Sequence, residues 1–424
     1  MTRTKLLLIL LLFTYPLAAQ SYDSNLDKLI DEAIRVSPKL KMLRVKQSVS
    51  ESRIPQVSNL PDPTLTFGAM NLPVNSFKFT QEPMTSKIIG LSQAVPFPGK
   101  LSAAGKAQAK DVEINQQEID DAANEIINEV QKNYYDLRFY REAIRIAKKS
   151  KNLLDKIAEV VRTKYAVSKA SQQNLIQIEV EITKINDKIE ELKSMENSAL
   201  TALNSLLLKE PASPIETDSI PGIHNYSIDF NGLVKTAEEN RPFLKGILLA
   251  KEKSKLTEAL YEYEFYPNFN FSIQYSQRDK IAATNAPLND FLSFVVGLNI
   301  PLDYGGKKSS KVEEARLMQQ LYADQYNLAL QTLYKNFGAS LARLNEFKER
   351  EKLIEDGLLP QAVQSLNAAL ANYQVGEIDF INVLDAQNKV YEIETNLYKI
   401  RTNFFKEISQ LEFLIGKRIN KEQF

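Results

Sequence analysis

The feature that most constrains this fold is an internal duplication. Landmark residues in the first half of the chain recur about 204 to 208 positions later, in the same order and at nearly the same spacing. The matching pairs are Pro38 and Pro242, Pro63 and Pro267, Gly90 and Gly297, Gly99-Lys100 and Gly306-Lys307, Tyr165-x-Val167 and Tyr373-x-Val375, and Leu203-x-x-Leu206 and Leu411-x-x-Leu414. Such a duplication predicts two copies of one structural unit, so that whatever one half builds is built twice in each subunit.

The composition favours long helices and argues against several partners. The 424 residues include only 14 Gly and neither Trp nor Cys, and 25% of them are charged. Lys+Arg and Asp+Glu balance at 53 each, so we expect neither nucleic acid nor an anionic surface as a partner. With the single His224 and no Cys, the chain offers no cluster for a soft metal ion and no evident catalytic base. We therefore expect neither a cofactor nor an enzyme.

The first residues have the pattern of a signal peptide. Residues 1–20 carry basic residues at their start and an apolar run at 6–13. They end in Leu17-Ala18-Ala19-Gln20, whose small residues are typical of a signal-peptide cleavage site. Nothing in the remainder is apolar over the roughly 18 residues that a helical membrane span requires. After export, the chain is therefore expected either to be soluble or to cross a membrane as β-structure.

The first repeat, residues 21–208, changes its hydrophobic period twice. Apolar residues at helical spacing predict a helix over 25–54 with a break near Pro38, and Pro55, Pro61 and Pro63 predict its end. Two-residue alternation then predicts strands, and the helical period returns after Gly99-Lys100. The predicted elements after the first helix are strands at 64–70 and 87–96 and a long helical hairpin at 100–208 that turns near 167–171.

The second repeat, residues 231–416, has the same order. Its predicted elements are a helix, strands at 268–276 and 292–301, and a helical hairpin at 306–416 with its tip at Gly376 and a bend near Gly357 and Pro360. The Pro-containing segment 209–230 links the two repeats, and residues 417–424 form a tail.

The strands decide which assembly the sequence favours. Each has about ten residues, the length of one tilted membrane crossing, and alternates apolar with small polar residues. Four strands cannot close a barrel. Two subunits would supply eight strands, whose interior is filled by side chains, whereas three would supply twelve and leave a lumen. We therefore predict a mainly α-helical homotrimer, in which a twelve-stranded β-barrel crosses a membrane and the helical hairpins continue it as an α-barrel.

At this point the chain resembles the TolC-like bacterial outer-membrane efflux proteins. The resemblance covers essentially the whole mature chain, and its most specific parts are duplicated in order. They are Tyr165-Ala166-Val167-Ser168, Tyr373-Gln374-Val375-Gly376, the run Val383-Leu384-Asp385-Ala386-Gln387, and the Pro-rich strand borders that end in Gly-Lys. Three further motifs look most like the branch that accompanies heavy-metal and other cation pumps: Pro61-Asp62-Pro63, Val95-Pro96-Phe97-Pro98-Gly99-Lys100 and Leu358-Leu359-Pro360-Gln361.

This resemblance implies an assembly and a function. It implies a homotrimer whose barrel contacts outer-membrane lipid and whose helices cross the periplasm. There the tips would meet a periplasmic adaptor protein and, through it, an inner-membrane pump. The expected function is the exit duct of this tripartite efflux system, which passively conducts small solutes or cations to the exterior through a tip that opens and closes.

The resemblance also places a gate near the second tip. It implies pore-constricting residues at Asn382 and Asp385, and Asp385 lies nine residues past Gly376, or about 13 Å along a helix. A trimer would repeat Asp385 as a ring of three carboxylates, which favours cations. A family acid is replaced by Asn382, so the charge of the gate stays open. Tyr373 and Ile381 are predicted to lock the closed tip by packing. The alternative for Asn382 and Asp385 is that they lie on a solvent-exposed helix face. The alternative for Tyr373 and Ile381 is ordinary packing between helices.

The two tips themselves are predicted to contact the adaptor, against the alternative that they are merely turns. The residues concerned are Val167, Ser168, Lys169 and Ala170 in the first tip and Val375, Gly376, Glu377 and Ile378 in the second.

Two other functions stay compatible with the sequence. The same architecture could export proteins or peptides, and the sequence does not separate these cargoes. A soluble periplasmic coiled-coil adaptor or scaffold would explain the hairpins, but it would leave four alternating strands without a role.

Overall fold

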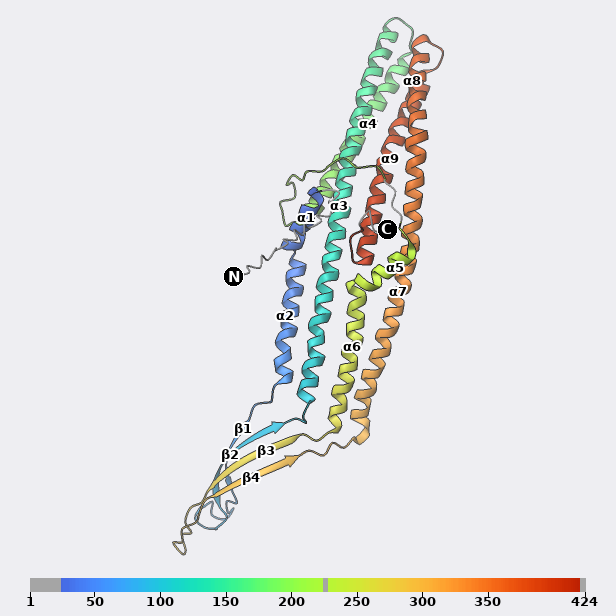
Figure 1. Cartoon of the computed structure of the whole chain (residues 1–424). Coiled ribbons are helices and arrows are strands. Elements are labelled where there is room, and N and C mark those ends of the chain that lie inside the picture. The colour runs from blue at the N-terminus through green and yellow to red at the C-terminus, as the bar shows by residue number, and fades with distance from the viewer. Residues whose placement is uncertain (1–23, 224–227, 420–424) are drawn as a thin grey trace, which may run out of the picture.

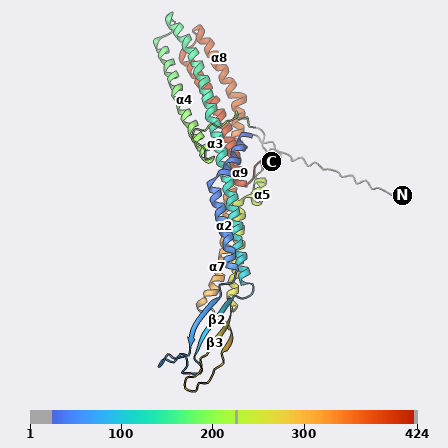
Figure 2. The same ribbon diagram turned by 90° about the vertical axis from the view of Figure 1, so that its left-hand side faces the viewer.

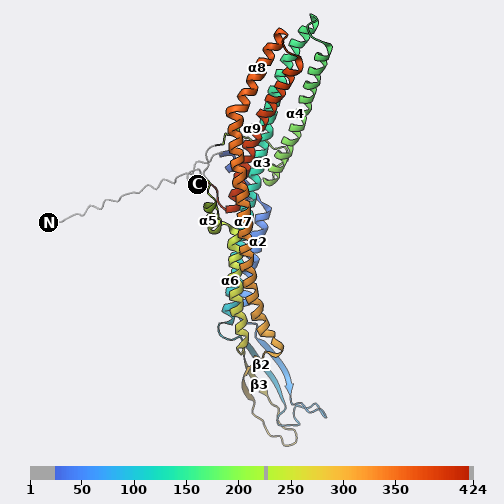
Figure 3. The same ribbon diagram turned by 90° about the vertical axis from the view of Figure 1, so that its right-hand side faces the viewer.

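The computed structural model of the protein describes residues 24–223 and 228–419. The expected signal peptide, His224 and Phe424 therefore lie outside the described residues. The described part is long and narrow, with a small sheet at one end and two helical tips at the other (Figure 1). It stays narrow in both views turned by 90° (Figures 2 and 3), so the helices form a thin layer rather than surrounding one globular core.

Both halves of the chain contain the same succession of two helices, two strands and two long helical segments. The first half has α1 (Ser24–Val36), α2 (Pro38–Ser58), β1 (Thr64–Met70), β2 (Ser86–Val95), α3 (Lys100–Ala166) and α4 (Gln172–Leu206). The second half has α5 (Phe230–Asn240), α6 (Pro242–Glu262), the 3-10 turn η1 (Tyr263–Phe265), β3 (Phe269–Gln277), β4 (Phe291–Leu298), the turn η2 (Tyr304–Gly306), α7 (Lys307–Leu353), the π-helical turn η3 (Ile354–Leu358), α8 (Leu359–Val375) and α9 (Phe380–Ile415). The prediction of a mainly helical fold with a few antiparallel strands is confirmed.

One prediction about these elements is wrong. Pro55 does not end the first helical segment, because α2 continues to Ser58 and the N–H of Asn59 donates to the carbonyl of Pro55 at 3.2 Å. Pro55 is exposed, so the Glu51 carbonyl that its ring leaves without a helical partner can bond to water. The bend predicted near Gly357 and Pro360 lies at η3, where the helix changes from α to π geometry.

The sheet has the strand order β1-β2-β3-β4, and all neighbouring strands are antiparallel. Its register separates two kinds of side chain. Two successive rows on one face are Leu65, Leu91, Ile273 and Phe294, and Phe67, Ile89, Tyr275 and Leu292. The row between them, on the opposite face, is Thr66, Gly90, Gln274 and Ser293. In these three rows, one face is therefore apolar and the opposite face is polar or lacks a side chain.

The helices continue the sheet as two successive layers. Near the sheet, α2, α3, α6 and α7 lie side by side in that order (Figure 1). Farther away, α3 and α4 pair beside α8 and α9. None of the helices in the described part of the chain combines the length with the apolar character that a membrane span requires.

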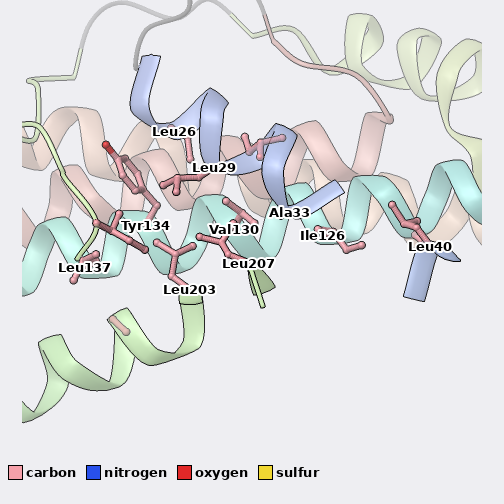
Figure 4. Close-up of a cluster of buried hydrophobic side chains, with 14 of the residues drawn as sticks. Leu26, Leu29, Ala33, Leu40, Ile126, Val130, Tyr134, Leu137, Leu203 and Leu207 are labelled. Atoms are coloured by element: carbon pink, nitrogen blue, oxygen red, sulfur yellow. The ribbon is translucent and has the colours of Figure 1, made fainter. Parts of the chain in front are cut away.

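One of the buried apolar clusters lies where α1 crosses α3 (Figure 4). Leu29 and Ala33 of α1 pack with Val130 and Tyr134 of α3, and the end of α4 adds Leu203. Ala33, Val130, Tyr134 and Leu203 are fully buried. This cluster fixes the short α1 against the long helix that carries the first tip.

The linker between the halves is held by two arginines of α3. Arg138 Nε donates to the carbonyl of Asp218 at 3.0 Å, and Arg141 Nη1 donates to the carbonyl of Ile215 at 2.7 Å. Ile215 and Ile220 bury their side chains. The described part of this Pro-containing segment is therefore extended, and its backbone carbonyls accept hydrogen bonds from side chains instead of from the N–H groups of a helix.

Candidate functional site

The two helical tips end in turns of the same geometry. At the first tip, Ser168 has a positive φ of 59°, and the N–H of Lys169 donates to the carbonyl of Lys164 at 2.8 Å. At the second tip, Gly376 has a φ of 88°, and the N–H of Glu377 donates to the carbonyl of Asn372 at 2.9 Å. Both turns therefore satisfy a helix-terminal carbonyl through a left-handed residue. Gly376 adopts this conformation without the strain that Ser168 carries.

Most of the residues predicted to contact an adaptor are exposed at these turns. Val167 is 60% exposed and Val375 is 73% exposed, although both are apolar. Ser168, Lys169, Gly376 and Glu377 are also exposed, whereas Ala170 and Ile378 are half-buried. Each tip thus presents one apolar side chain within a polar turn.

Tyr373 is the buried member of the predicted gate. It is 6% exposed, and its ring lies 5.3 Å from that of Phe380, centroid to centroid. Both belong to an apolar cluster that also contains Val161 of α3 and Ile178 of α4. Burial raises the pKa of the Tyr373 phenol above its ordinary value. The cluster therefore joins the second tip to the first hairpin by packing.

Lys164 makes a polar connection between the tips that the sequence did not reveal. Its Nζ donates to the carbonyls of Tyr373 at 2.7 Å and Gln374 at 3.0 Å, and it lies 4.6 Å from the Tyr373 ring centroid. A cation on the last carbonyls of α8 is favoured by the helix dipole, and the ring adds a cation–π contact. Lys164 precedes Tyr165 in the first repeat, whereas Asn372 precedes Tyr373 at the equivalent position of the second repeat. This difference between the repeats is the one sign in the sequence that Lys164 has a special role.

Asp385 and Asn382 lie on an exposed face of α9. The opposite face of the helix buries Val383, Leu384, Ala386 and Gln387. Asp385 is paired with Lys389, whose Nζ lies 2.5 Å from Oδ2, and the two side chains are 61% and 62% exposed. Such a pair stabilises the helix only slightly, by about 0.3–0.5 kcal/mol, but it brings a positive charge to within one turn of the predicted ring. The pair of Asp385 and Lys389 was not predicted, although the i,i+4 spacing of the two residues in the sequence indicates it.

Ile381 lies apart from the Tyr373 cluster. It is 53% exposed and lines a groove of about 630 Å³ between α4 and α9, together with Ile176, Val180 and Leu384. The structure therefore brings Tyr373 and Phe380 together but leaves Ile381 exposed on the groove between α4 and α9. Among the described residues, no group of three or more His, Cys, Asp or Glu side chains is arranged to hold a metal ion.

The apolar face of the sheet is the second candidate site. The side chains of its Leu65–Leu91–Ile273–Phe294 row are between 39% and 74% exposed. Phe67 in the next row is 68% exposed. An uncovered apolar sheet face of this size fits a lipid environment.

These features identify the class of protein. The family model described as outer membrane efflux protein matches residues 29–207 and 233–417, which is most of both halves of the chain. The chain belongs to the outer membrane efflux protein family, a family of TolC-like channels, and it is located in the outer membrane.

Individual relatives are distant but cover most of the chain. The cobalt-zinc-cadmium resistance protein CzcC of Cupriavidus metallidurans is 20% identical over 323 residues, which cover 75% of this chain and 74% of the relative. The crystal structure of the outer membrane protein VceC of Vibrio cholerae is 18% identical, with a TM-score of 0.77, over 93% of this chain and 97% of that one. The CmeC outer membrane channel of Campylobacter jejuni is 15% identical, with a TM-score of 0.76, over 95% of this chain and 88% of that one. At these identities the structural likeness shows the fold.

Proposed function

We propose that the protein is the outer-membrane exit duct of a tripartite efflux system. In this proposal, a homotrimer passively conducts small solutes or cations from an inner-membrane pump and a periplasmic adaptor to the exterior. The observation that carries the proposal is that one chain is an open segment of a wall. Its sheet ends in β1 and β4, which are edge strands in the described part of the chain, and its helical layer ends in α2 and α7 on the same two sides.

Both open sides of the helical layer expose apolar side chains. On α2 these are Met42, Val45 and Val49, between 47% and 64% exposed, at the spacing of one helix face. On α7 they are Leu317, Leu321 and Leu328, between 46% and 62% exposed. A second copy whose α2 packs on α7, and whose β1 pairs with β4, would cover both edges at once.

The number of copies in the ring follows from the open lumen that a duct requires. Two copies of the four-stranded sheet would give a barrel that side chains fill, whereas three copies give twelve strands and an open passage. The small, polar row of Thr66, Gly90, Gln274 and Ser293 would line this passage. No side chain of that row is charged, which suits a passive conduit.

The exposed tips fit the adaptor, and a relative suggests the cargo. Val167 and Val375 each offer an apolar contact at the end farthest from the sheet. The name of CzcC states cobalt-zinc-cadmium resistance. Together with the Pro61-Asp62-Pro63 and Gly99-Lys100 motifs, this supports metal cations as the cargo of the associated pump.

Native mass measurement of the full chain in mild detergent tests the assembly. We expect a homotrimer that conducts ions in planar bilayers, and in-cell crosslinking from position 167 or 375 should capture one adaptor, with which one pump co-purifies. A monomer recovered without detergent would overturn the duct and favour a soluble adaptor. Capture of a protein-secretion pump would keep the architecture and replace the cargo by peptides.

A further inference from the structure

The duplication makes α6 the counterpart of α2 and α7 the counterpart of α3. Pro38 begins α2, and Pro242 begins α6, 204 positions later. Lys100 begins α3, and Lys307 begins α7, 207 positions later. Within the chain, α3 packs against α6 (Figure 1). Their counterparts α7 and α2 are the two open sides of the helical layer, so the α3–α6 contact is a template for packing α7 of one copy on α2 of the next.

Burial supports the correspondence between α2 and α6. Leu40 and Leu244 occupy equivalent positions, and both are buried. Ser50 and Ser254 are also equivalent, and both are buried although they are polar. The two helices therefore turn the same face toward their neighbours in the layer, and contacts of α6 can be transferred to α2.

Two ion pairs fasten α3 to α6. Lys253 Nζ lies 2.6 Å from Asp111 Oδ1, and Lys110 Nζ lies 2.9 Å from Glu252 Oε2. The equivalent positions of α7 and α2 carry mostly apolar side chains, which are Met318 and Val49 for the first pair and Leu317 and Ser48 for the second. The contact inside the chain is therefore charged, whereas its counterpart between copies is apolar.

The exposed apolar side chains of the two open sides match in this register. Leu321 of α7 falls opposite Val45 of α2, and Leu317 falls opposite Val49. All four side chains are exposed in the single chain. Packing in this register removes them from water together, which favours the association of copies.

The same register also matches two opposite charges. Arg53, near the end of α2, falls opposite Glu313, near the start of α7, and both side chains are exposed in the single chain. A shift of one helical turn would place Arg53 opposite Ser309 or Leu317 instead. Charged pairs at the rim of an interface fix its register more than they add to its affinity.

We propose that α7 of one copy packs antiparallel on α2 of the next in the register of the α3–α6 contact. From the middle of the molecule toward the sheet, the facing pairs are Asp324 and Met42, Leu321 and Val45, Leu317 and Val49, and Glu313 and Arg53. The contact inside each chain is held by charge, and the contact between copies is closed by apolar side chains. This inference rests on the proposed homotrimer and specifies the surface through which its copies meet.

The absence of Cys from the sequence allows the register to be tested by disulfide formation. A Cβ at Gly246 would lie 3.7 Å from the Cβ of Gln117, within the range that a disulfide requires. Their counterparts are Met42 and Asp324. We expect the full-length double variant Met42→Cys, Asp324→Cys, oxidised in mild detergent, to run as a covalent trimer in non-reducing denaturing gels and as a monomer after reduction. Gln117→Cys with Gly246→Cys should close the same disulfide within one chain and is the positive control.

Crossed pairs of the same positions supply the matched negative controls. Leu317→Cys with Val49→Cys is a second pair in register and should also link the copies. Met42→Cys with Leu317→Cys places the partners seven residues out of register, about 10 Å along the helix axes, and so does Val49→Cys with Asp324→Cys. Both crossed variants should run as monomers in the same gels.

The outcomes separate the register from the duct. If native mass measurement shows a trimer but a crossed pair links the copies, the register is overturned and the duct is not. The same holds if the positive control closes its disulfide and neither pair in register links the copies of the trimer. A protein that is monomeric in mild detergent would overturn the homotrimer and this interface together.

Discussion

Arg401 Nε donates to Glu351 Oε1 across 2.6 Å, and the two side chains are only 9% and 8% exposed. Arg401 Nη2 also meets Glu355 at 2.7 Å, and the N–H of Ile223 donates to Glu351 at 2.9 Å. This buried pair therefore ties α9 and the linker to the end of α7, directly before the π-helical turn η3. The second hairpin carries the predicted gate, and these ion pairs join its two helices at η3.

Breaking this pair should destabilise the protein strongly. Arg401→Met leaves Glu351 buried without its partner, and we expect a loss of about 3–5 kcal/mol. The double change Arg401→Met, Glu351→Met should recover a large part of that loss, because no buried charge is left. Thermal unfolding of the detergent-solubilised protein measures both. Arg343→Met, which removes a pair with a 46% exposed arginine, should cost about 1 kcal/mol or less. An equally small effect of Arg401→Met would show that water reaches the pair.

The gate charges predict opposite effects on cation block. In the proposed trimer, Asp385→Ala should raise single-channel conductance and weaken block by multivalent cations, because the three Asp385 carboxylates that would converge there are lost. Lys389→Gln should strengthen the block, because it removes the ammonium that lies 2.5 Å from Asp385. Recordings in planar bilayers with divalent and trivalent ions measure both variants. If neither changes the block, this face of α9 is an outer surface and not a pore lining.

Lys164 should keep the tips together. Lys164→Met removes two charge-assisted hydrogen bonds to the end of α8, and we expect the observed arrangement of the tips to lose about 2 kcal/mol relative to an arrangement in which the tips are apart. The measurable result is a higher open probability of reconstituted channels. Lys156→Met, at an exposed position two turns earlier on α3, is the control and should behave like the parent. A parental open probability in the Lys164→Met channel would show that the apolar cluster alone holds the tips.

Local sequence patterns predicted the helices and strands, but they did not predict which residues distant in the sequence contact each other. β1 lies at Thr64–Met70, where the two-residue alternation predicted a strand, because alternation records which face each side chain takes. The end of α2 was misjudged because a proline near an exposed helix end costs little once water serves the freed carbonyl. Arg401 and Glu351 are 50 residues apart, and no periodicity relates them. Lys164 is an ordinary surface lysine in the sequence, and its position matters only because the fold brings the two tips together.

Gly416 ends α9 where a side chain does not fit. Its φ is 71°, and a Cβ there would lie 2.8 Å from Arg241 Cα and 3.0 Å from the Asn240 carbonyl oxygen. Gly416→Ala should therefore destabilise the protein by about 2 kcal/mol or more, through left-handed strain and backbone contact. Gly338→Ala, inside α7 with nothing within 4 Å, should instead stabilise it by about 0.5–1 kcal/mol. Thermal unfolding of the two variants side by side checks the difference in sign, and a neutral Gly416→Ala would mean that the α5–α6 corner moves away.

Glu412 gives the middle of the molecule a dependence on pH. Its carboxylate accepts from Gln131 Nε2 at 2.8 Å and from the N–H of Ile419 at 3.0 Å. Desolvation nevertheless raises the pKa of Glu412, against these bonds and the positive charge of Arg418, and Asp27 adds to the rise. Because the folded pKa lies above the unfolded one, the protonated acid is the form that folding favours. Its contribution is complete below the ordinary value of about 4.3 and is lost as the pH rises through the folded pKa.

Replacing this carboxyl by a neutral amide should remove that dependence. Glu412→Gln keeps an acceptor for Ile419, and its NH2 group can donate to Gln131 Oε1, a buried atom with no partner among the described contacts, once the Gln131 amide turns over to present that oxygen. We therefore expect Glu412→Gln to raise the unfolding temperature at pH 7.5 and to change it little at pH 4, where the parent acid is already protonated. Thermal unfolding in detergent across this range measures the difference between variant and parent. A variant that is less stable than the parent at pH 7.5 would show that the ionised carboxylate, through its two hydrogen bonds and Arg418, stabilises the folded state.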